Sequence, residues 1–167
     1  MSNAAFTLED QKKKIGNILG PSNPVRVTQA MIDEFARTTL DPDPMHIDPE
    51  WCENFGPFPT TIAFGFLTMS LITTLVHDLL KYDRESRIGT GGFPLNYGFN
   101  KLRLIAPVPV NANLTLTAKL VHVEERKPGQ LLQTNEITMH IEGQETPALV
   151  GEWLAVWVNE ELESKAS

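Results

Sequence analysis

Cysteine is nearly absent from this sequence, since Cys52 is the only one among 167 residues. A lone cysteine cannot form an intramolecular disulfide, which excludes the small secreted modules that disulfides hold together. A chain of this length can bury a hydrophobic core without such a crosslink. We therefore predict one domain in a reducing compartment, for which the cytoplasm is the expected location.

Positive charge is also scarce: 14 Lys and Arg stand against 21 Asp and Glu, which gives a net charge of −7. This charge repels nucleic acid and anionic lipid at long range, so neither is expected as the main partner. An anionic ligand would require basic residues gathered locally. Residues 1–14 lack the apolar segment of a secretory signal peptide, so none is predicted there.

Charged residues are missing altogether between Asn54 and His77. Pro57 and Pro59 interrupt this stretch, and the helical remainder at residues 62–76 is shorter than the roughly 20 residues that a bilayer span requires. We therefore predict a buried helix of a soluble protein and no membrane span.

The uncharged helix has few polar positions. Thr60 or Thr61 is expected to cap it, and its end is expected near Leu80 or Tyr82. Because apolar side chains occupy almost every face, we expect the helix to lie at the centre of the fold, surrounded by other structure.

Three shorter elements are predicted before this helix. A first helix is expected to begin at Thr7 and to end by Gly20. A short strand is expected at residues 24–27, and a second helix is expected to begin after Thr28 and to end near Leu40.

From residue 96 onward the apolar pattern changes to a period of two. Four strands are predicted, at residues 97–105, 114–123, 131–141 and 149–158. A long apolar helix followed by meandering strands indicates an α+β fold, in which a curved antiparallel sheet wraps around the central helix. We expect one domain over residues 1–159, with an N-terminal helical extension over about residues 1–24, and a polar tail over residues 160–167.

The 40–49 loop, LDPDPMHIDP, holds three prolines, three aspartates and one histidine. Proline fixes φ and removes a backbone donor, so we expect a stiff loop that orients its side chains at low entropic cost. Asp41 and His46 are the candidate catalytic pair, because a carboxylate and an imidazole on one rigid loop can bind and activate water. Addition of water to a C=C bond beside a carbonyl needs such groups.

Two other interpretations fit the same loop. One is a rigid turn in which Asp43 and Asp48 cap nearby amides. The other is a metal site formed by Asp41, Asp43, His46 and Asp48, although the prolines and the lack of the glycine and terminal glutamate of a calcium loop count against it.

The start of the central helix can hold the negative charge that develops on a carbonyl oxygen. Amides at a helix N-terminus point outward, at the positive end of the helix dipole. Gly65 lacks a Cβ and would let a ligand approach the backbone closely. A glycine near a helix start is also common for purely structural reasons.

In four ordered segments the sequence resembles the MaoC-like dehydratases, a family that includes the (R)-specific enoyl-CoA hydratases and has a hot-dog fold. The segments are VTQAMIDEFA from Val27, DPDPMHID from Asp41, TIAFGFLT from Thr61 and YGFNKLRLIAPV from Tyr97. The resemblance implies a homodimeric hydro-lyase that adds water reversibly to trans-2-enoyl thioesters and gives a (3R)-hydroxyacyl product without a cofactor.

The resemblance also implies roles for single residues. Asp41 and His46 would bind and activate the water, and the Gly65 amide would bind the thioester carbonyl. The sequence departs from the family pattern at two positions: Phe64 stands where the family usually has His, and Asp43 stands where Asn is frequent. We expect Phe64 to reshape the pocket.

Three further residues are candidates for substrate binding. Thr73 lies two helical turns after Gly65 and is expected to face the same pocket, unless it serves core packing. Lys101 and Arg103 share one strand face and are expected to contact the phosphates of a CoA or acyl-carrier thioester, unless that face is merely solvated. No metal site is predicted.

Two rival functions belong to other classes. A non-catalytic hot-dog module that binds acyl thioesters, or assembles with a catalytic partner, is expected to lack Asp41 or His46, and both are present. A hot-dog thioesterase usually has an acidic residue on the central helix, and residues 60–77 contain none.

Overall fold

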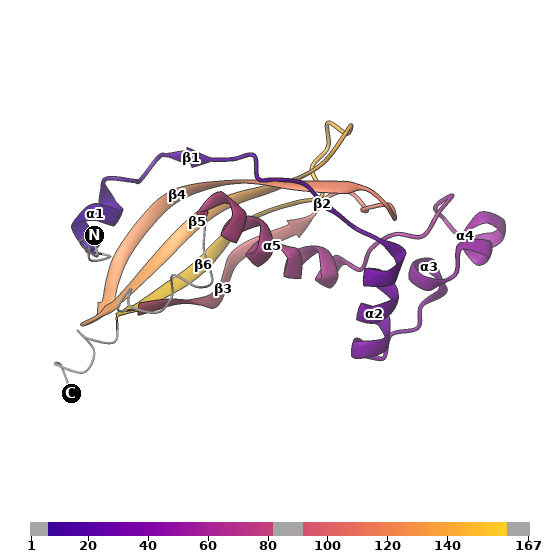
Figure 1. Cartoon of the computed structure of the whole chain (residues 1–167), viewed down its shortest axis with the longest axis horizontal. Coiled ribbons are helices and arrows are strands. Elements are labelled where there is room, and N and C mark those ends of the chain that lie inside the picture. Colours follow the sequence, from indigo (N-terminus) through magenta and orange to yellow (C-terminus); the bar gives the residue numbers. More distant parts are fainter. Residues whose placement is uncertain (1–6, 82–91, 160–167) are drawn as a thin grey trace.

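One curved antiparallel sheet dominates the molecule. A computed structural model of the chain describes residues 7–81 and 92–159. The strands follow the order β1-β4-β5-β6-β3, and β2 also pairs with β4. Figure 1 shows this sheet arching over the helix α5 (Gly65–Leu79). The predicted α+β architecture, a curved sheet around a central helix, is confirmed.

The four long strands lie where the period-two pattern predicts them. They are β3 (Gly92–Leu104), β4 (Asn113–Lys127), β5 (Gln130–Ile141) and β6 (Leu149–Asn159). Two short strands, β1 (Ile18–Leu19) and β2 (Val25–Arg26), pair with β4. The sequence predicts β2 within residues 24–27, whereas β1 lies in a stretch where only a helix is expected.

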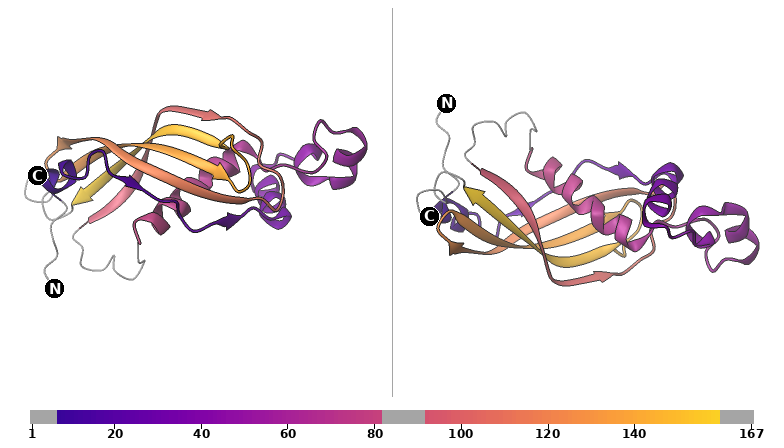
Figure 2. Two further views of the ribbon diagram at one scale, coloured as in Figure 1. Left: turned by 90° about the horizontal axis from the view of Figure 1, so that it is seen from above. Right: turned by 90° about the horizontal axis from the view of Figure 1, so that it is seen from below.

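From residue 7 onward, four helices precede α5: α1 (Leu8–Lys12), α2 (Gln29–Thr39), α3 (Pro44–Ile47) and α4 (Pro49–Phe55). Thr7 and Thr28 cap α1 and α2 as predicted, since their hydroxyl oxygens accept the amides of Asp10 and Met31. The helices α2, α3 and α4 lie beyond one end of the sheet, next to the start of α5 (Figures 1 and 2). Residues 160–167, the predicted tail, lie outside the described residues.

The predicted cap of the central helix is wrong. The helix begins at Gly65, with Phe64 at its N-cap and no side-chain capping bond. Residues 61–63 are held extended instead, because the Ala63 amide donates to the Val108 carbonyl at 2.8 Å and the Val110 amide donates to the Thr61 carbonyl at 2.9 Å. Because these bonds require an extended backbone, the helix cannot begin before residue 64.

Within one chain, α5 is buried on one side only. Leu67, Ile72 and Leu75 pack in the core against the sheet. Phe66 is 71% exposed, and Ser70 and Thr74 on the same side are also exposed. The expected burial of this helix on every face is therefore not achieved by a single chain. Between residues 7 and 81 and between 92 and 159, no helix has the length and apolar character of a membrane span.

Candidate active site

The 40–49 loop begins at a left-handed turn. Leu40 follows α2 with a φ of 59°, and the amides of Leu40 and Asp41 both donate to the Ala36 carbonyl. This closes the end of α2 in the way that a C-terminal glycine usually does. A non-glycine residue in this conformation is uncommon and is often found at functional sites. The turn fixes the position from which Asp41 leaves the helix.

Asp43 and Asp48 hold the shape of this loop. Oδ1 of Asp43 accepts the Met45 amide and Oδ1 of Asp48 accepts the Trp51 amide, each at 2.9 Å, so they cap α3 and α4. The proline after each cap has no amide that needs an acceptor. The capping interpretation is therefore confirmed for both aspartates. An asparagine at position 43 could make the same cap.

His46 is the chemically distinctive residue of the loop. It is 9% exposed, and its Nδ1 lies 2.7 Å from the carbonyl oxygen of Ile62. Because a carbonyl only accepts hydrogen bonds, this contact assigns the proton of the neutral ring to Nδ1 and leaves the lone pair on Nε2. An imidazole fixed in this tautomer can act as a general base through Nε2.

The contact with Ile62 also places His46 beside the start of α5. Ile62 and Gly65 are three residues apart, and α5 has no side-chain cap that would compete for its first amides. A Cβ at position 65 would meet the end of the Leu104 side chain of β3, which shows that this strand lies against the start of the helix. The histidine and a helix N-terminus, both predicted from sequence, are thus neighbours.

Comparisons with known proteins identify the family of this chain. The family model described as MaoC like domain matches residues 10–141. The chain belongs to the MaoC-like dehydratase family. The 3-hydroxyacyl-thioester dehydratase Z of Mycobacterium tuberculosis is 36% identical over 152 residues, which are 91% of this chain and 96% of that protein. Nodulation protein N of Rhizobium leguminosarum bv. viciae is 34% identical over 151 residues, 90% of this chain and 91% of its own.

Solved structures of MaoC-like proteins share the fold. A MaoC-like dehydratase from Rhodospirillum rubrum matches with a TM-score of 0.69 and 21% identity, over 91% of this chain and 96% of its own. An (R)-hydratase from A. caviae matches with a TM-score of 0.63 and 25% identity, over 84% of this chain and 94% of its own. The predicted hot-dog fold is confirmed by these matches.

Phe64 is the main departure of this MaoC-like chain from the family pattern. Its ring lies on the His46 imidazole, with centroids 3.7 Å apart and planes at 31°, and its centroid is 5.2 Å from that of Phe35. Phe64 is 5% exposed. It therefore gives His46 an apolar wall, where the usual histidine would add a second titratable group.

Gln29 is a site residue that the sequence did not reveal. Its Nε2 donates to the His46 carbonyl at 2.8 Å and to Oδ1 of Asp33 at 2.8 Å, and its Oε1 accepts the Thr61 hydroxyl at 2.6 Å. One side chain of α2 thus joins the 40–49 loop to the segment that leads into α5. Its partners on those segments are 17 and 32 residues away in sequence, so no local pattern reports these contacts.

Asp41 occupies the exposed outer part of the loop. Within residues 7–81 and 92–159, its carboxylate makes no hydrogen bond or ion pair, with His46 or with any other residue. The structure therefore brings together His46, Phe64 and Gly65 and leaves Asp41 at the surface.

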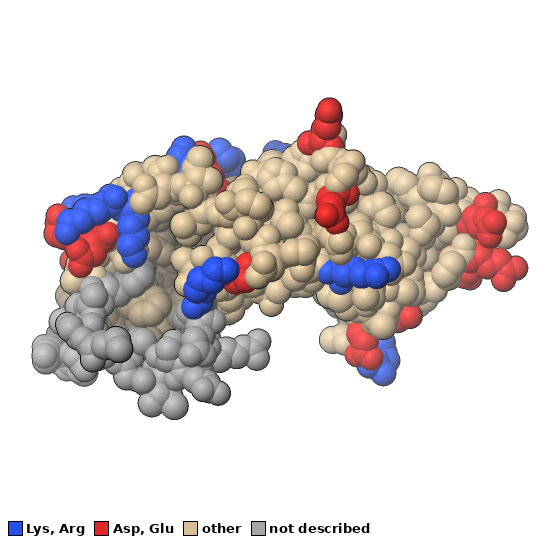
Figure 3. Space-filling model, turned by 45° about the horizontal axis from the view of Figure 1, so that its top comes forward, with Lys and Arg blue, Asp and Glu red and all other residues tan. Residues whose placement is uncertain are grey.

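In the described part of the chain, none of the three other candidates forms a hydrogen bond with His46. Thr73 lines a cavity further along α5, and neither His46 nor Gly65 lines it. Lys101 forms an ion pair with Glu152 at 2.6 Å, whereas the exposed Arg103 donates to the Leu102 carbonyl. Figure 3 shows charges of both signs scattered over an otherwise uncharged face, with acidic side chains at the α4 end. A phosphate would have to compete with Glu152 for Lys101, so Arg103 is the more accessible cation.

Proposed function

We propose that this MaoC-like chain catalyses the reversible addition of water to trans-2-enoyl thioesters, giving (3R)-3-hydroxyacyl thioesters, with Asp41, His46 and Gly65 as its catalytic groups. The observation that carries the proposal is the bond from His46 Nδ1 to the Ile62 carbonyl, which leaves a basic Nε2 beside a helix N-terminus. The dehydratase name of the 36% identical relative supports the reaction class.

The proposed hydration proceeds through a water held by Asp41 and His46. Nε2 of His46 takes a proton from this water as its oxygen forms a bond to C3. The π electrons move toward C2 and the thioester carbonyl, where the Gly65 amide and the helix dipole stabilise the negative charge. A proton then returns to C2. Dehydration is the same path in reverse.

Only the elements of water are transferred, so the proposed reaction requires no cofactor. We propose a CoA or acyl-carrier thioester as substrate, with Phe64 shaping the pocket and Arg103, and Lys101 when released from Glu152, near the phosphates. We also propose a cytoplasmic location, on the ground of the single buried cysteine.

A homodimer is part of the proposal. Among the described strands, β3 pairs only with β6 and forms one edge of the sheet. It exposes large apolar side chains, Leu95, Tyr97 and Leu104, and Phe66 of α5 is exposed as well. Exposed apolar surface on an unprotected edge strand is typical of an interface.

The test follows the loss of enoyl absorbance with crotonyl-CoA and longer trans-2-enoyl-CoA substrates. We expect Asp41→Asn and His46→Ala each to lower kcat/KM by about 100-fold or more, the usual contribution of a general acid or base. Matched controls are Asp43→Asn, which keeps the α3 cap, and His122→Ala on an exposed strand position; both should retain activity.

Full activity of the double variant Asp41→Asn/His46→Ala would contradict the assignment of these two residues as catalytic. A (3S) product would contradict the proposed stereochemistry. No activity of the wild type on any chain length would favour a non-catalytic thioester-binding module instead.

A further inference from the structure

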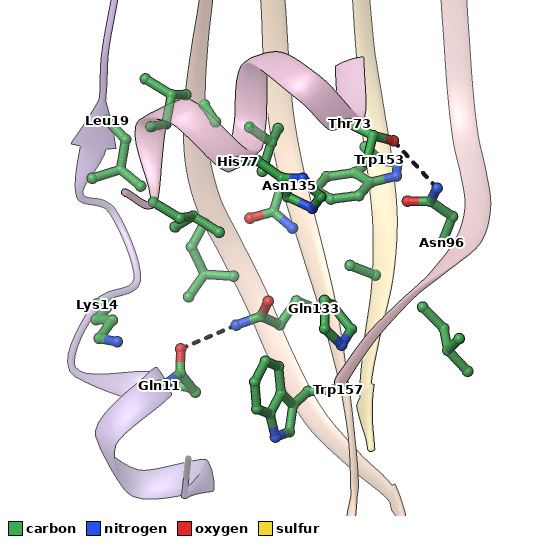
Figure 4. Close-up of a pocket in the computed structure, with 18 of the residues that line it drawn as sticks. Gln11, Lys14, Leu19, Thr73, His77, Asn96, Gln133, Asn135, Trp153 and Trp157 are labelled. Carbon is green, nitrogen blue, oxygen red and sulfur yellow. Dashed lines mark hydrogen bonds between the residues drawn. The ribbon is translucent and has the colours of Figure 1, made fainter. Parts of the chain in front are cut away.

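A cavity of about 450 Å³ lies on the concave face of the sheet, beyond the His46 site. Its volume is that of a small-molecule pocket. Side chains from α5, β3, β5 and β6 surround it, as Figure 4 shows; those that carry the argument are Thr73, Asn96, Gln133, Asn135, Trp153 and Trp157.

The polar groups of this cavity are mainly amides. Gln133 Nε2 donates to Gln11 at 3.0 Å and Asn96 Nδ2 donates to the Thr73 hydroxyl at 3.3 Å, which leaves the Oδ1 of Asn96 as an acceptor. The Asn135 side chain has no hydrogen-bond partner in the parts of the chain that the structure describes. Its amide therefore presents both a donor and an acceptor to a ligand.

Most of the lining is apolar and suits an alkyl chain, but its amides favour a chain that also carries a polar group. An alkyl chain would displace water from these amides without replacing its hydrogen bonds, whereas a hydroxyl or carbonyl group would replace them. The described residues of the lining include no Asp or Glu, and the two basic side chains there, Lys14 and His77, already have interactions of their own. Trp153 and Trp157 add flat apolar surface beside the amides. An uncharged chain bearing oxygen fits this combination.

One face of α5 runs from the proposed catalytic site to the cavity. Gly65, Met69 and Thr73 are spaced by four residues and share that face. Gly65 lies against Leu104 of β3, and Thr73 bonds to Asn96 of the same strand. Eight helical residues span about 12 Å, the reach of an extended chain of roughly ten carbon atoms.

We infer that the cavity binds an uncharged, oxygen-bearing group at the far end of a long acyl chain, and that Asn135 is its principal hydrogen-bonding residue. The substrate class is then a trans-2-enoyl thioester of about ten or more carbons with a hydroxyl or carbonyl near its end. This inference rests on the proposed hydratase function for its substrate, but the cavity can be tested without catalysis.

The experiment compares trans-2-dodecenoyl-CoA with its 12-hydroxy and 12-carboxy derivatives, and crotonyl-CoA serves as the short substrate. We expect the wild type to prefer the 12-hydroxy chain over the plain chain by about tenfold in kcat/KM. Asn135→Leu should remove this preference and leave crotonyl-CoA hydration unchanged. Gln144→Leu, the same kind of change on an exposed turn, should leave both unchanged.

A second readout is binding of the saturated analogues, dodecanoyl-CoA and 12-hydroxydodecanoyl-CoA, followed by tryptophan fluorescence, since two of the three Trp residues line the cavity. Tighter binding of the hydroxy analogue that is lost in Asn135→Leu supports the inference even if no hydration occurs. The inference is overturned if both analogues bind equally or if the preference for the hydroxy analogue survives Asn135→Leu. A preference for the 12-carboxy chain overturns it as well. Absence of hydration on every substrate counts against the proposed function alone.

Discussion

At the residue scale, the position of His46 depends on side chains outside its own loop. Its ring is held by the Ile62 carbonyl and the Phe64 ring, and its backbone is held by Gln29. A base that must meet a water at hydrogen-bond distance is sensitive to small displacements, so Gln29 is a positioning residue of the proposed site.

We expect Gln29→Leu to lower kcat by about 10- to 100-fold, because the His46 carbonyl and the Thr61 hydroxyl both lose their partner. KM should change little, and the melting temperature should fall by a few degrees because the Thr61 hydroxyl is buried. Thr61→Val removes only the second of these bonds and should give a smaller loss. Steady-state kinetics and thermal unfolding of the purified variants check this. A fall in melting temperature with an unchanged kcat for the folded fraction would assign Gln29 a structural role only.

The residues of the site differ in how well sequence reveals them. Sequence reveals Asp41 and His46 because a carboxylate and an imidazole lie close together on one proline-rich loop. It reveals Gly65 because a glycine stands at the start of an apolar helix. The capping roles of Asp43 and Asp48 are also accessible from sequence, because each aspartate accepts an amide two or three residues ahead. Gln29 is invisible to such reasoning, since its contacts depend on how α2 meets segments far along the chain.

At the element scale, the two ends of α5 are fixed by different contacts. Its start follows from the extended residues 61–63, which the apolar pattern alone misassigned to the helix. Its last turn is attached to the segment before β2, because Oδ2 of Asp78 accepts the Asn23 amide at 2.7 Å and Oδ1 accepts the Asn23 side chain at 2.8 Å. Neither contact has a sequence signal, since both join distant segments.

The Asp78 contact makes stability depend on pH. The Asn23 backbone hydrogen bond is the main cause that lowers the pKa of Asp78 below its ordinary value of 3.8, and Lys81 contributes. A lowered pKa in the folded state stabilises the fold above pH 3.8, and this contribution disappears as the pH falls through the folded-state pKa. We expect Asp78→Asn to reduce the free energy of unfolding at pH 7.

The difference between wild type and Asp78→Asn should then shrink at pH values below 3.8. Urea unfolding at pH 7 and at pH 3 measures it. Glu53→Gln, a change of the same kind at an exposed position of α4, should show no such trend. A difference of equal size at both pH values would mean that the ionised carboxylate does not stabilise this junction.

At the scale of the whole molecule, the class of fold is the most predictable property. A period of two over four long segments and an uncharged helix are sufficient for a curved sheet around a helix. The exposed side of α5 and the apolar edge at β3 are not predictable in this way, because they depend on which surfaces a single chain leaves uncovered.

We expect the chain to sediment as a dimer of twice its 18.6 kDa. Tyr97→Lys, which places a charge on the exposed edge strand beneath Arg126, should weaken the dimer by at least about tenfold. Ile18→Lys is the matched control, since Ile18 is 71% exposed on β1 at the opposite edge. Sedimentation equilibrium distinguishes the outcomes, and equal dissociation of both variants would place the interface away from β3.

The single cysteine packs against the loop that carries His46. Cys52 is 2% exposed, and its Sγ lies 3.5 Å and 3.7 Å from the carbonyl oxygens of Met45 and Pro44 in the 40–49 loop. Burial raises the pKa of this thiol, and the Asp48 and Asp43 carboxylates add to the effect. An alkylating reagent meets the thiolate only when the loop lifts from α4. The rate of Cys52 alkylation in the unmodified protein therefore measures how often the loop that carries His46 opens.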